Sequence, residues 1–218
     1  MNRSDLRSAA ERTRAGDGRT SWSLGSLRSW STREIVIAAV LAVAVGVVFW
    51  TWDLLWATAF AAVPFPVSYL LVGIWMIGGL LIPYVVRKPG AALVGELVAA
   101  FVSMILVNQW GFAVMLSGLV QGVGAELIFA ASGYRRYSLP VLMAAGALAG
   151  VFSIFLDSFV YSYWHIYSLG SILLGVVLVA LSGALLGGLL SKALADGLAR
   201  TGVLSGLAIS RGARRRLG

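Results

Sequence analysis

Six uninterrupted apolar runs determine what this 218-residue chain can fold into. They cover roughly residues 35–56, 66–86, 90–107, 112–131, 139–159 and 169–190. At a rise of 1.5 Å per residue, each run is long enough for a hydrocarbon core about 30 Å thick. The runs do not alternate polar with apolar residues, so helices are expected rather than barrel strands. The sequence therefore predicts an all-α integral membrane protein built as a bundle of six transmembrane helices.

Composition and domain organisation agree with a membrane location. Hydrophobic residues make up 59% of the chain and charged residues only 12%, against nearly half and about a quarter in soluble domains. Three parts are expected: a basic, disordered N-terminal tail (1–34), the six-helix domain (35–190) and a basic C-terminal tail (191–218). The chain has no cysteine, so it contains no disulfide framework and no thiolate metal site.

The placement of positive charge predicts the topology. All 17 lysines and arginines fall in four segments, which are the two ends of the chain, Arg87-Lys88 and Arg135-Arg136. With an even number of crossings these segments share one side, which the positive-inside rule makes cytoplasmic. Both termini are thus predicted to be cytoplasmic. The net charge of +8 is explained without a nucleic-acid partner.

Four carboxylates lie inside the apolar runs: Asp53, Glu96, Glu126 and Asp157. An ionised group deep in a span costs roughly 2.5–3.5 kcal/mol, so such residues usually pair or serve a function. Asp53 and Asp157 lie near the outer ends of their spans. Glu96 and Glu126 lie in the inner half, where tying helices together and serving a function are both open roles.

A pocket that opens outward is expected among these spans. Spans three, four and five each present a polar face to the outer half, and span two and the outer loops supply aromatic rings, which an interfacial belt would also explain. Such walls suit a flat polar or cationic heterocycle, held by stacking and cation–π contact and read at its edge by an amide or an acid. The candidate binding residues are Trp56, Tyr69, Trp75, Glu96, Ser103, Asn108, Gln121, Asp157 and Trp164. Among them Asn108, Gln121 and Asp157 are expected to read the edge.

Catalytic and metal sites are not indicated. The chain has no phosphate-binding loop of a nucleotide hydrolase, and its single histidine, His165, provides neither a multi-histidine metal site nor a basis for a Ser-His-Asp triad.

Small residues recur at four-residue spacing in the first run, at Ala38, Ala42 and Gly46. This spacing suits close helix packing, either within the bundle or against a partner subunit.

Two motifs carry a resemblance to a known family. One is Ile82–Ala92 (IPYVVRKPGAA) followed by Glu96, and the other is Ser117–Glu126 (SGLVQGVGAE) followed by Phe129 and Ala130. Together they resemble the substrate-binding S components of energy-coupling-factor (ECF) transporters, of the YkoE type. The similarity extends from about residue 34 to 190.

This resemblance implies a transport subunit without enzymatic activity or cofactor in a prokaryotic cell membrane. S components of this type are associated with uptake of thiamin or its hydroxymethylpyrimidine precursor, which they bind near the outer face. They pair with a membrane-embedded coupling protein and two cytoplasmic ATPases, which drive the S component to topple and release its substrate inward. The family also commonly meets the coupling protein through small residues in its first helix, a role that Ala38, Ala42 and Gly46 would fill.

One position departs from the family pattern. Ser103 stands where the family often has a second acid, seven residues after Glu96. If that acid reads the ring, this chain would use Asp157, Asp53 or Glu96 instead, or would prefer a different pyrimidine. Two other functions also stay open. One is a stand-alone, proton-coupled carrier of a small heterocycle that uses Glu96 and Glu126 as proton relays, and the other is a membrane scaffold whose acids only tie helices together.

Overall fold

The computed structural model describes residues 30–210, and all regular secondary structure in this part is helical. Five stretches are long and apolar enough to cross a membrane. They are Thr32–Ala57, Val67–Val86, Ala113–Ala131, Leu139–Val160 and Leu169–Arg200. The remaining apolar helix, α4 (Ala91–Ile105), has 15 residues, which is roughly 22 Å of helix. The all-helical membrane fold is as predicted, but the third of the six expected crossings is shorter than a full span.

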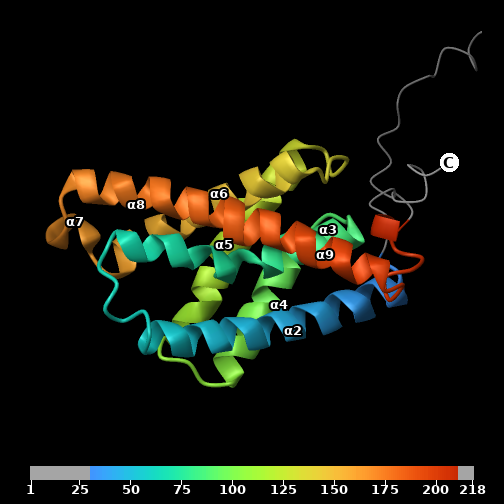
Figure 1. Cartoon of the computed structure of the whole chain (residues 1–218), viewed down its shortest axis with the longest axis horizontal. Helices are drawn as coiled ribbons and strands as arrows, with labels where there is room; N and C mark the ends of the chain where they lie inside the picture. The colour runs from blue at the N-terminus through green and yellow to red at the C-terminus, as the bar shows by residue number, and fades with distance from the viewer. Residues whose placement is uncertain (1–29, 211–218) are drawn as a thin grey trace, which may run out of the picture.

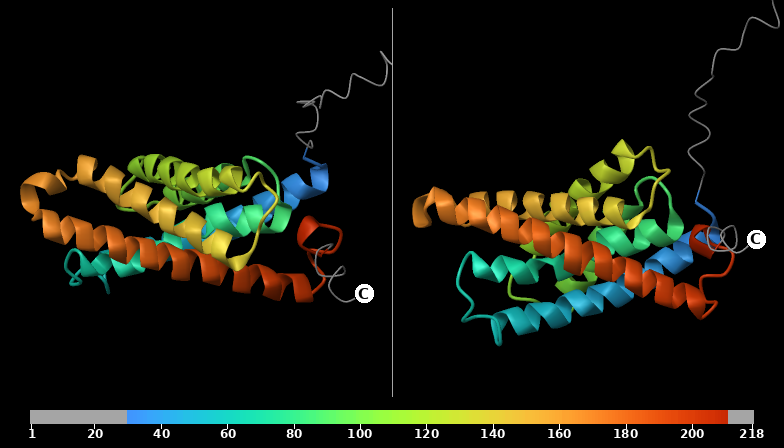
Figure 2. Two further views of the ribbon diagram at one scale, coloured as in Figure 1. Left: turned by 90° about the horizontal axis from the view of Figure 1, so that it is seen from above. Right: turned by 45° about the horizontal axis from the view of Figure 1, so that its top comes forward.

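The long helices run along the longest axis of the molecule, and its two ends differ (Figures 1 and 2). These helices are α2 (Thr32–Ala57), α6 (Leu139–Val160) and α8 (Leu169–Ser182), whereas α5 (Ala113–Ala131) crosses the bundle obliquely. One end carries the short helix α7 (Tyr163–Ile166) and the loop 58–66, and we call it the α7 end. The opposite end carries the start of α2, the turn between α3 and α4, the loop between α5 and α6 and the helix α9 (Leu190–Arg200). We call it the charged end, because these segments contain every lysine and arginine that the structure describes: Arg33, Arg87, Lys88, Arg135, Arg136, Lys192 and Arg200.

The second apolar run is divided into two helices of different type. Its first half, η2 (Val67–Met76), is a 3-10 helix, and its second half is α3 (Gly78–Val86). Ser182 of α8 holds η2 in place, because its hydroxyl donates to the Leu70 carbonyl at 2.7 Å and accepts from the Gly73 amide at 2.9 Å. Gly73 is required there, since a Cβ would collide with the Ser182 backbone. This divided span is the most deeply buried of the long apolar stretches.

The last span contains a π-helical segment, η3 (Gly183–Leu189), between α8 and α9 (Leu190–Arg200). At its start Gly183 lies against Gly146 of α6, and a Cβ on either glycine would collide with the carbonyl oxygen of the other. The close approach of the two backbones therefore depends on both residues being glycine.

The final helix extends further than hydropathy predicts. Its expected end was near residue 190, but α9 continues to Arg200 because it is amphipathic rather than uniformly apolar. Ala195 is buried, and Asp196 accepts a hydrogen bond of 2.9 Å from the Tyr84 hydroxyl of α3. The expected boundary between residues 190 and 191 thus falls inside a continuous helix. Beyond it, Leu204 and Leu207 are also buried.

The start of α2 is fixed by a capping box. Ser31 accepts from the Glu34 amide at 3.3 Å, and Glu34 accepts from the Ser31 amide at 2.9 Å. Glu34 also pairs with Lys88 at 3.3 Å, which ties α2 to the turn between α3 and α4. The helix therefore begins three residues inside the expected N-terminal tail (1–34). The rest of that tail up to residue 29, and residues 211–218 of the C-terminal tail, lie outside the described residues.

A second carboxylate caps the start of α4. Glu126 of α5 accepts from the backbone amides of Gly90 at 2.6 Å, Ala92 at 2.9 Å and Leu93 at 3.3 Å. A helix start leaves such amides without an intrahelical partner and favours negative charge, so the contact stabilises α4 in both respects. Of the two roles open for Glu126, the structure shows the helix tie.

Replacing Glu126 by alanine should destabilise the fold. Three amides at a partly buried helix start would lose their acceptor, and an unsatisfied buried donor costs about 1–3 kcal/mol. We expect the apparent Tm of the detergent-solubilised protein to fall clearly for Glu126→Ala and less for Glu126→Gln, which keeps one acceptor oxygen. Equal Tm values for the alanine variant and the native protein would contradict this role.

Candidate functional site

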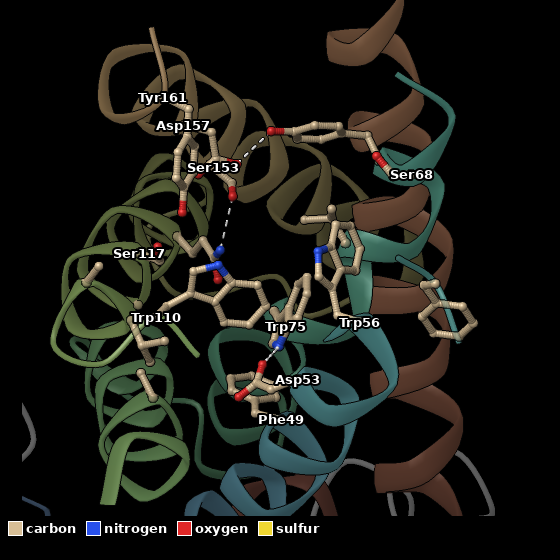
Figure 3. Close-up of a pocket in the computed structure, with 18 of the residues that line it drawn as sticks. Phe49, Asp53, Trp56, Ser68, Trp75, Trp110, Ser117, Ser153, Asp157 and Tyr161 are labelled. Atoms are coloured by element: carbon tan, nitrogen blue, oxygen red, sulfur yellow. Dashed lines mark hydrogen bonds between the residues drawn. The ribbon is translucent and has the colours of Figure 1, made fainter. Parts of the chain in front are cut away.

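A cavity of about 400 Å³ lies at the α7 end of the bundle, and we call it the chamber (Figure 3). Residues of α2, η2, α4, α5 and α6 line it, together with the connections at the α7 end. A cavity of this size is in the range typical of small-molecule sites. Many of the side chains that line it are aromatic rings and carboxylates, and these residues form three groups.

The first group is a wall of tryptophans around an acid. The Trp75 ring contacts Trp56 at a centroid distance of 5.0 Å and meets Trp110 edge-on at 5.4 Å. The Trp75 indole N–H donates to Asp53 Oδ1 at 2.7 Å, and the Ser103 hydroxyl donates to Asp53 Oδ2. Asp53 is therefore a buried carboxylate that neutral donors satisfy and that lines the chamber beside three indole rings.

The second group is a tyrosine cluster around Asp157. The Tyr69 hydroxyl donates to Asp157 Oδ2 at 2.7 Å and lies 3.2 Å from the Tyr163 hydroxyl. Phe65 holds this cluster from the loop side, stacked on Tyr167 at 4.0 Å. Burial raises the pKa of the Tyr163 phenol to about 12, so this hydroxyl keeps its proton at neutral pH.

The third group forms the floor of the chamber. Glu96 of α4 accepts from the Gly79 amide of α3 at 2.5 Å and is 1% exposed. With its amide oriented so that every polar atom has a partner, Gln121 donates to Glu96 at 3.2 Å and to the Trp75 carbonyl at 2.9 Å. The Gln121 oxygen then accepts from the Ser153 hydroxyl at 3.1 Å. Glu96 thus ties α3 to α4 and also borders the cavity.

Seven of the nine candidate binding residues meet in this chamber. They are Trp56, Tyr69, Trp75, Glu96, Ser103, Gln121 and Asp157. These residues come from five different elements of the chain and from sequence positions a hundred residues apart. The aromatic and polar faces predicted for spans two to five therefore do converge at one end of the bundle. Whether each residue binds a ligand stays a prediction.

The other two candidates do not line the chamber. The Asn108 oxygen accepts from the backbone amides of Trp110 and Gly111, both at 2.9 Å, and its nitrogen donates to Ser103 at 3.1 Å. Asn108 therefore shapes the loop instead of presenting a free amide edge. Trp164 of α7 is 47% exposed, packs on Phe159 and is not among the residues that line the cavity.

Several lining residues were absent from the candidate set. Trp110, Phe65 and Tyr163 belong to the aromatic loops that the sequence marks, but an interfacial belt would give the same pattern. Asp53 was considered only as a substitute for the missing second acid of the family. Its position three residues before Trp56 places both side chains on one face of α2, and this was the signal available in the sequence.

The small residues of α2 pack inside the chain. Ala38 and Ala42 are 5% and 2% exposed. A Cβ on Gly46 would lie 2.5 Å from Val102 Cβ and 2.8 Å from the Ala99 carbonyl oxygen of α4. The stripe is thus packed inside the chain, which is one of the two roles that its spacing allows, and at Gly46 it packs against α4.

Comparison with known proteins places these features in context. The family model for the permease component of an ABC-type cobalt transport system matches residues 33–152. The chain is 44% identical over 186 residues to the putative HMP/thiamine permease protein YkoE of Bacillus subtilis (strain 168), covering 85% of this chain and 92% of that protein. It also matches the crystal structure of an S-component of an ECF transporter, with a TM-score of 0.82 and 42% identity over 86% of this chain and 95% of the other.

Replacing Asn108 by alanine should loosen the loop that carries Trp110. The substitution removes the acceptor of two loop amides, whereas Asn108→Asp keeps an oxygen in that position. We expect limited proteolysis to cleave the loop 106–112 faster in Asn108→Ala than in the native protein, with Asn108→Asp cleaved at close to the native rate. Unchanged cleavage in the alanine variant would show that other contacts hold the loop.

Proposed function

Because the chain belongs to the YkoE-type S components of ECF transporters, we propose that its chamber captures thiamin or the hydroxymethylpyrimidine precursor of thiamin. Membership of this family makes the chain the substrate-binding membrane subunit of an importer and not an enzyme. The name of the YkoE relative, an HMP/thiamine permease, supports the choice of substrate. The observation that carries the proposal is the pairing of aromatic walls with acids that face the same cavity.

Thiamin and its pyrimidine precursor are flat rings that match these walls. The aminopyrimidine ring offers N–H donors that a carboxylate can accept, and the thiazolium ring of thiamin is a cation that aromatic faces attract. Asp53 with its three tryptophans and Asp157 with its tyrosines provide both kinds of contact from two sides of the chamber. Since Asp157 takes one hydrogen bond from Tyr69, it keeps lone pairs for a ligand.

A metal ion is a second cargo to consider, because the matching family model is named for cobalt transport. Such a cargo needs several donor side chains at one point. Within residues 30–210 no group of three or more His, Cys, Asp and Glu side chains is placed to hold a metal ion. The acids of the chamber are separated and hydrogen-bonded to indole, hydroxyl and amide groups instead. The lining therefore favours an organic ring.

We further propose that the chain crosses the membrane six times, with α4 as the short crossing and the charged end in the cytoplasm. The positive-inside rule supports this orientation. The chamber then opens to the outside, and the partners are a transmembrane coupling protein and two cytoplasmic ATPases.

Because α4 covers the small-residue stripe of α2, the coupling protein would meet the opposite face of α2, where Val36, Val40, Val43 and Val47 are exposed.

The orientation can be tested by labelling, because the native chain has no cysteine. A single cysteine at His165 (His165→Cys) lies at the α7 end, and one at Arg135 (Arg135→Cys) lies at the charged end; both positions are exposed. We expect a membrane-impermeant maleimide to label His165→Cys in intact cells and Arg135→Cys only after the membrane is opened. The reverse pattern would overturn the proposed orientation.

Substrate binding can be tested with Asp157→Asn. The amide keeps an oxygen that can accept from Tyr69, so the fold is preserved while the negative charge is lost. We expect calorimetry on the purified protein to show binding of thiamin or hydroxymethylpyrimidine weakened by about tenfold or more, the scale of one charge-assisted hydrogen bond. Phe159→Ala is the matched control, since Phe159 lies on the same helix, is 69% exposed and faces away from the chamber. Absence of binding by the native protein to both compounds would overturn the proposed function.

A further inference from the structure

Within residues 30–210, no lysine or arginine borders the chamber. Three carboxylates line the cavity, those of Asp53, Glu96 and Asp157, and no lysine or arginine does. The sequence segments 34–86, 89–134 and 137–191 contain neither lysine nor arginine, so none is available from the connections at the α7 end. His165 is the single basic side chain there, and it does not line the cavity.

From this layout we infer that the chamber rejects phosphate esters and admits the same ring compound only in its unphosphorylated, neutral or cationic form. The inference rests on the proposed function, and it specifies the substrate class of that site. A phosphate monoester carries about −1.5 to −2 charges at neutral pH. Proteins usually bind such groups with arginine or lysine, or with free backbone amides at a helix start.

At two helix starts beside the chamber, those of α3 and α5, backbone amides are already hydrogen-bonded within the protein. The start of α3 is occupied by the protein's own carboxylate, because the Gly79 amide donates to Glu96 at 2.5 Å. At the start of α5, the amides of Ala113, Val114 and Met115 already bond to loop carbonyl oxygens, those of Trp110, Gly111 and Phe112, at 3.0–3.4 Å. A phosphate at either of these two helix starts would therefore meet amides that already have an acceptor, with carboxylates nearby.

The hydrogen-bonding character of the lining points the same way. The Trp75 indole and the Ser103 hydroxyl donate to Asp53, and the Tyr69 hydroxyl donates to Asp157. Both carboxylates keep accepting capacity toward the cavity, and the other polar groups of the lining, such as the Trp56 and Trp110 indoles, are neutral (Figure 3). A ligand that brings donors, such as an amino group or a hydroxyl, is complementary to this surface, whereas a phosphate brings only acceptors.

Three ligands that share one ring system separate charge from size. They are thiamin, its monophosphate and its acetate ester, which adds bulk at the same oxygen without adding charge. In calorimetry with the purified full chain we expect the monophosphate to bind at least on the order of 30-fold more weakly than thiamin, as like-charge repulsion at a low effective dielectric requires. The acetate ester should bind within about threefold of thiamin, because its added group is uncharged.

Each outcome decides a different question. A monophosphate that binds within about threefold of thiamin overturns the inference and leaves the proposed function standing. An acetate ester that loses as much affinity as the monophosphate shows exclusion by size and also overturns it. If thiamin itself does not bind, hydroxymethylpyrimidine and its monophosphate provide the same comparison. If neither parent compound binds, it is the proposed function that fails.

Charge removal assigns the exclusion to specific side chains. We expect the affinity ratio of thiamin to its monophosphate to shrink in Asp157→Asn, and also in Asp53→Asn, because each variant deletes one negative charge from the lining without changing its shape. A ratio that stays at the native value in both variants would overturn the assignment to these carboxylates. Since the measured quantity is a ratio within one variant, a general loss of affinity does not affect it.

Discussion

The chamber depends on one carboxylate that caps a helix start in the interior of the bundle. The second span changes from a 3-10 to an α-helix at Ile77, so α3 begins inside the protein, where backbone amides have no water to bond. Glu96 accepts from the Gly79 amide there and from Gln121 on its other oxygen. Gly78 permits the approach, since a Cβ on it would lie 2.9 Å from Glu96 Oε2. The same side chain thus stabilises the divided span and closes the floor of the cavity.

The 3-10 geometry of η2 explains why this division is useful. A 3-10 helix has three residues per turn, so side chains at intervals of three lie in one row. Tyr69, Val72 and Trp75 form such a row and all line the chamber. In an α-helix, with about 100° per residue, Trp75 would point roughly 120° away from Tyr69. The 3-10 geometry therefore places Tyr69, whose hydroxyl donates to Asp157, and Trp75 on the same wall of the chamber. Ser182 of α8 holds that geometry through two hydrogen bonds to η2.

Hydropathy and charge placement predict the helical membrane fold, the gathering of the described cations at one end and seven of the residues that line the chamber. They do so because apolar length and depth along a span can be counted in a sequence. The direction in which a side chain points around the helix is harder to derive. Hydropathy is the same for a 3-10 and an α-helix, so the division at Ile77 is invisible to it. Asn108 and Trp164 lie at the expected depth, yet one bonds its own loop and the other faces outward. Likewise, the spacing of Ala38 and Ala42 shows that a helix packs there but not which helix.

Topology and selectivity have a common physical origin in this chain. In the proposed orientation, the positive-inside rule keeps lysine and arginine away from the external half. The chamber, which lies in that half, can then use only carboxylates, amides, hydroxyls and rings for recognition. Each buried acid there is stabilised by neutral donors, such as the Trp75 indole for Asp53 and the Tyr69 hydroxyl for Asp157. Neutral donors leave the negative potential of the carboxylates largely uncancelled, whereas a salt-bridge partner would cancel it. The charge asymmetry that orients the protein therefore also makes its chamber suited to ligands that are cationic or rich in hydrogen-bond donors.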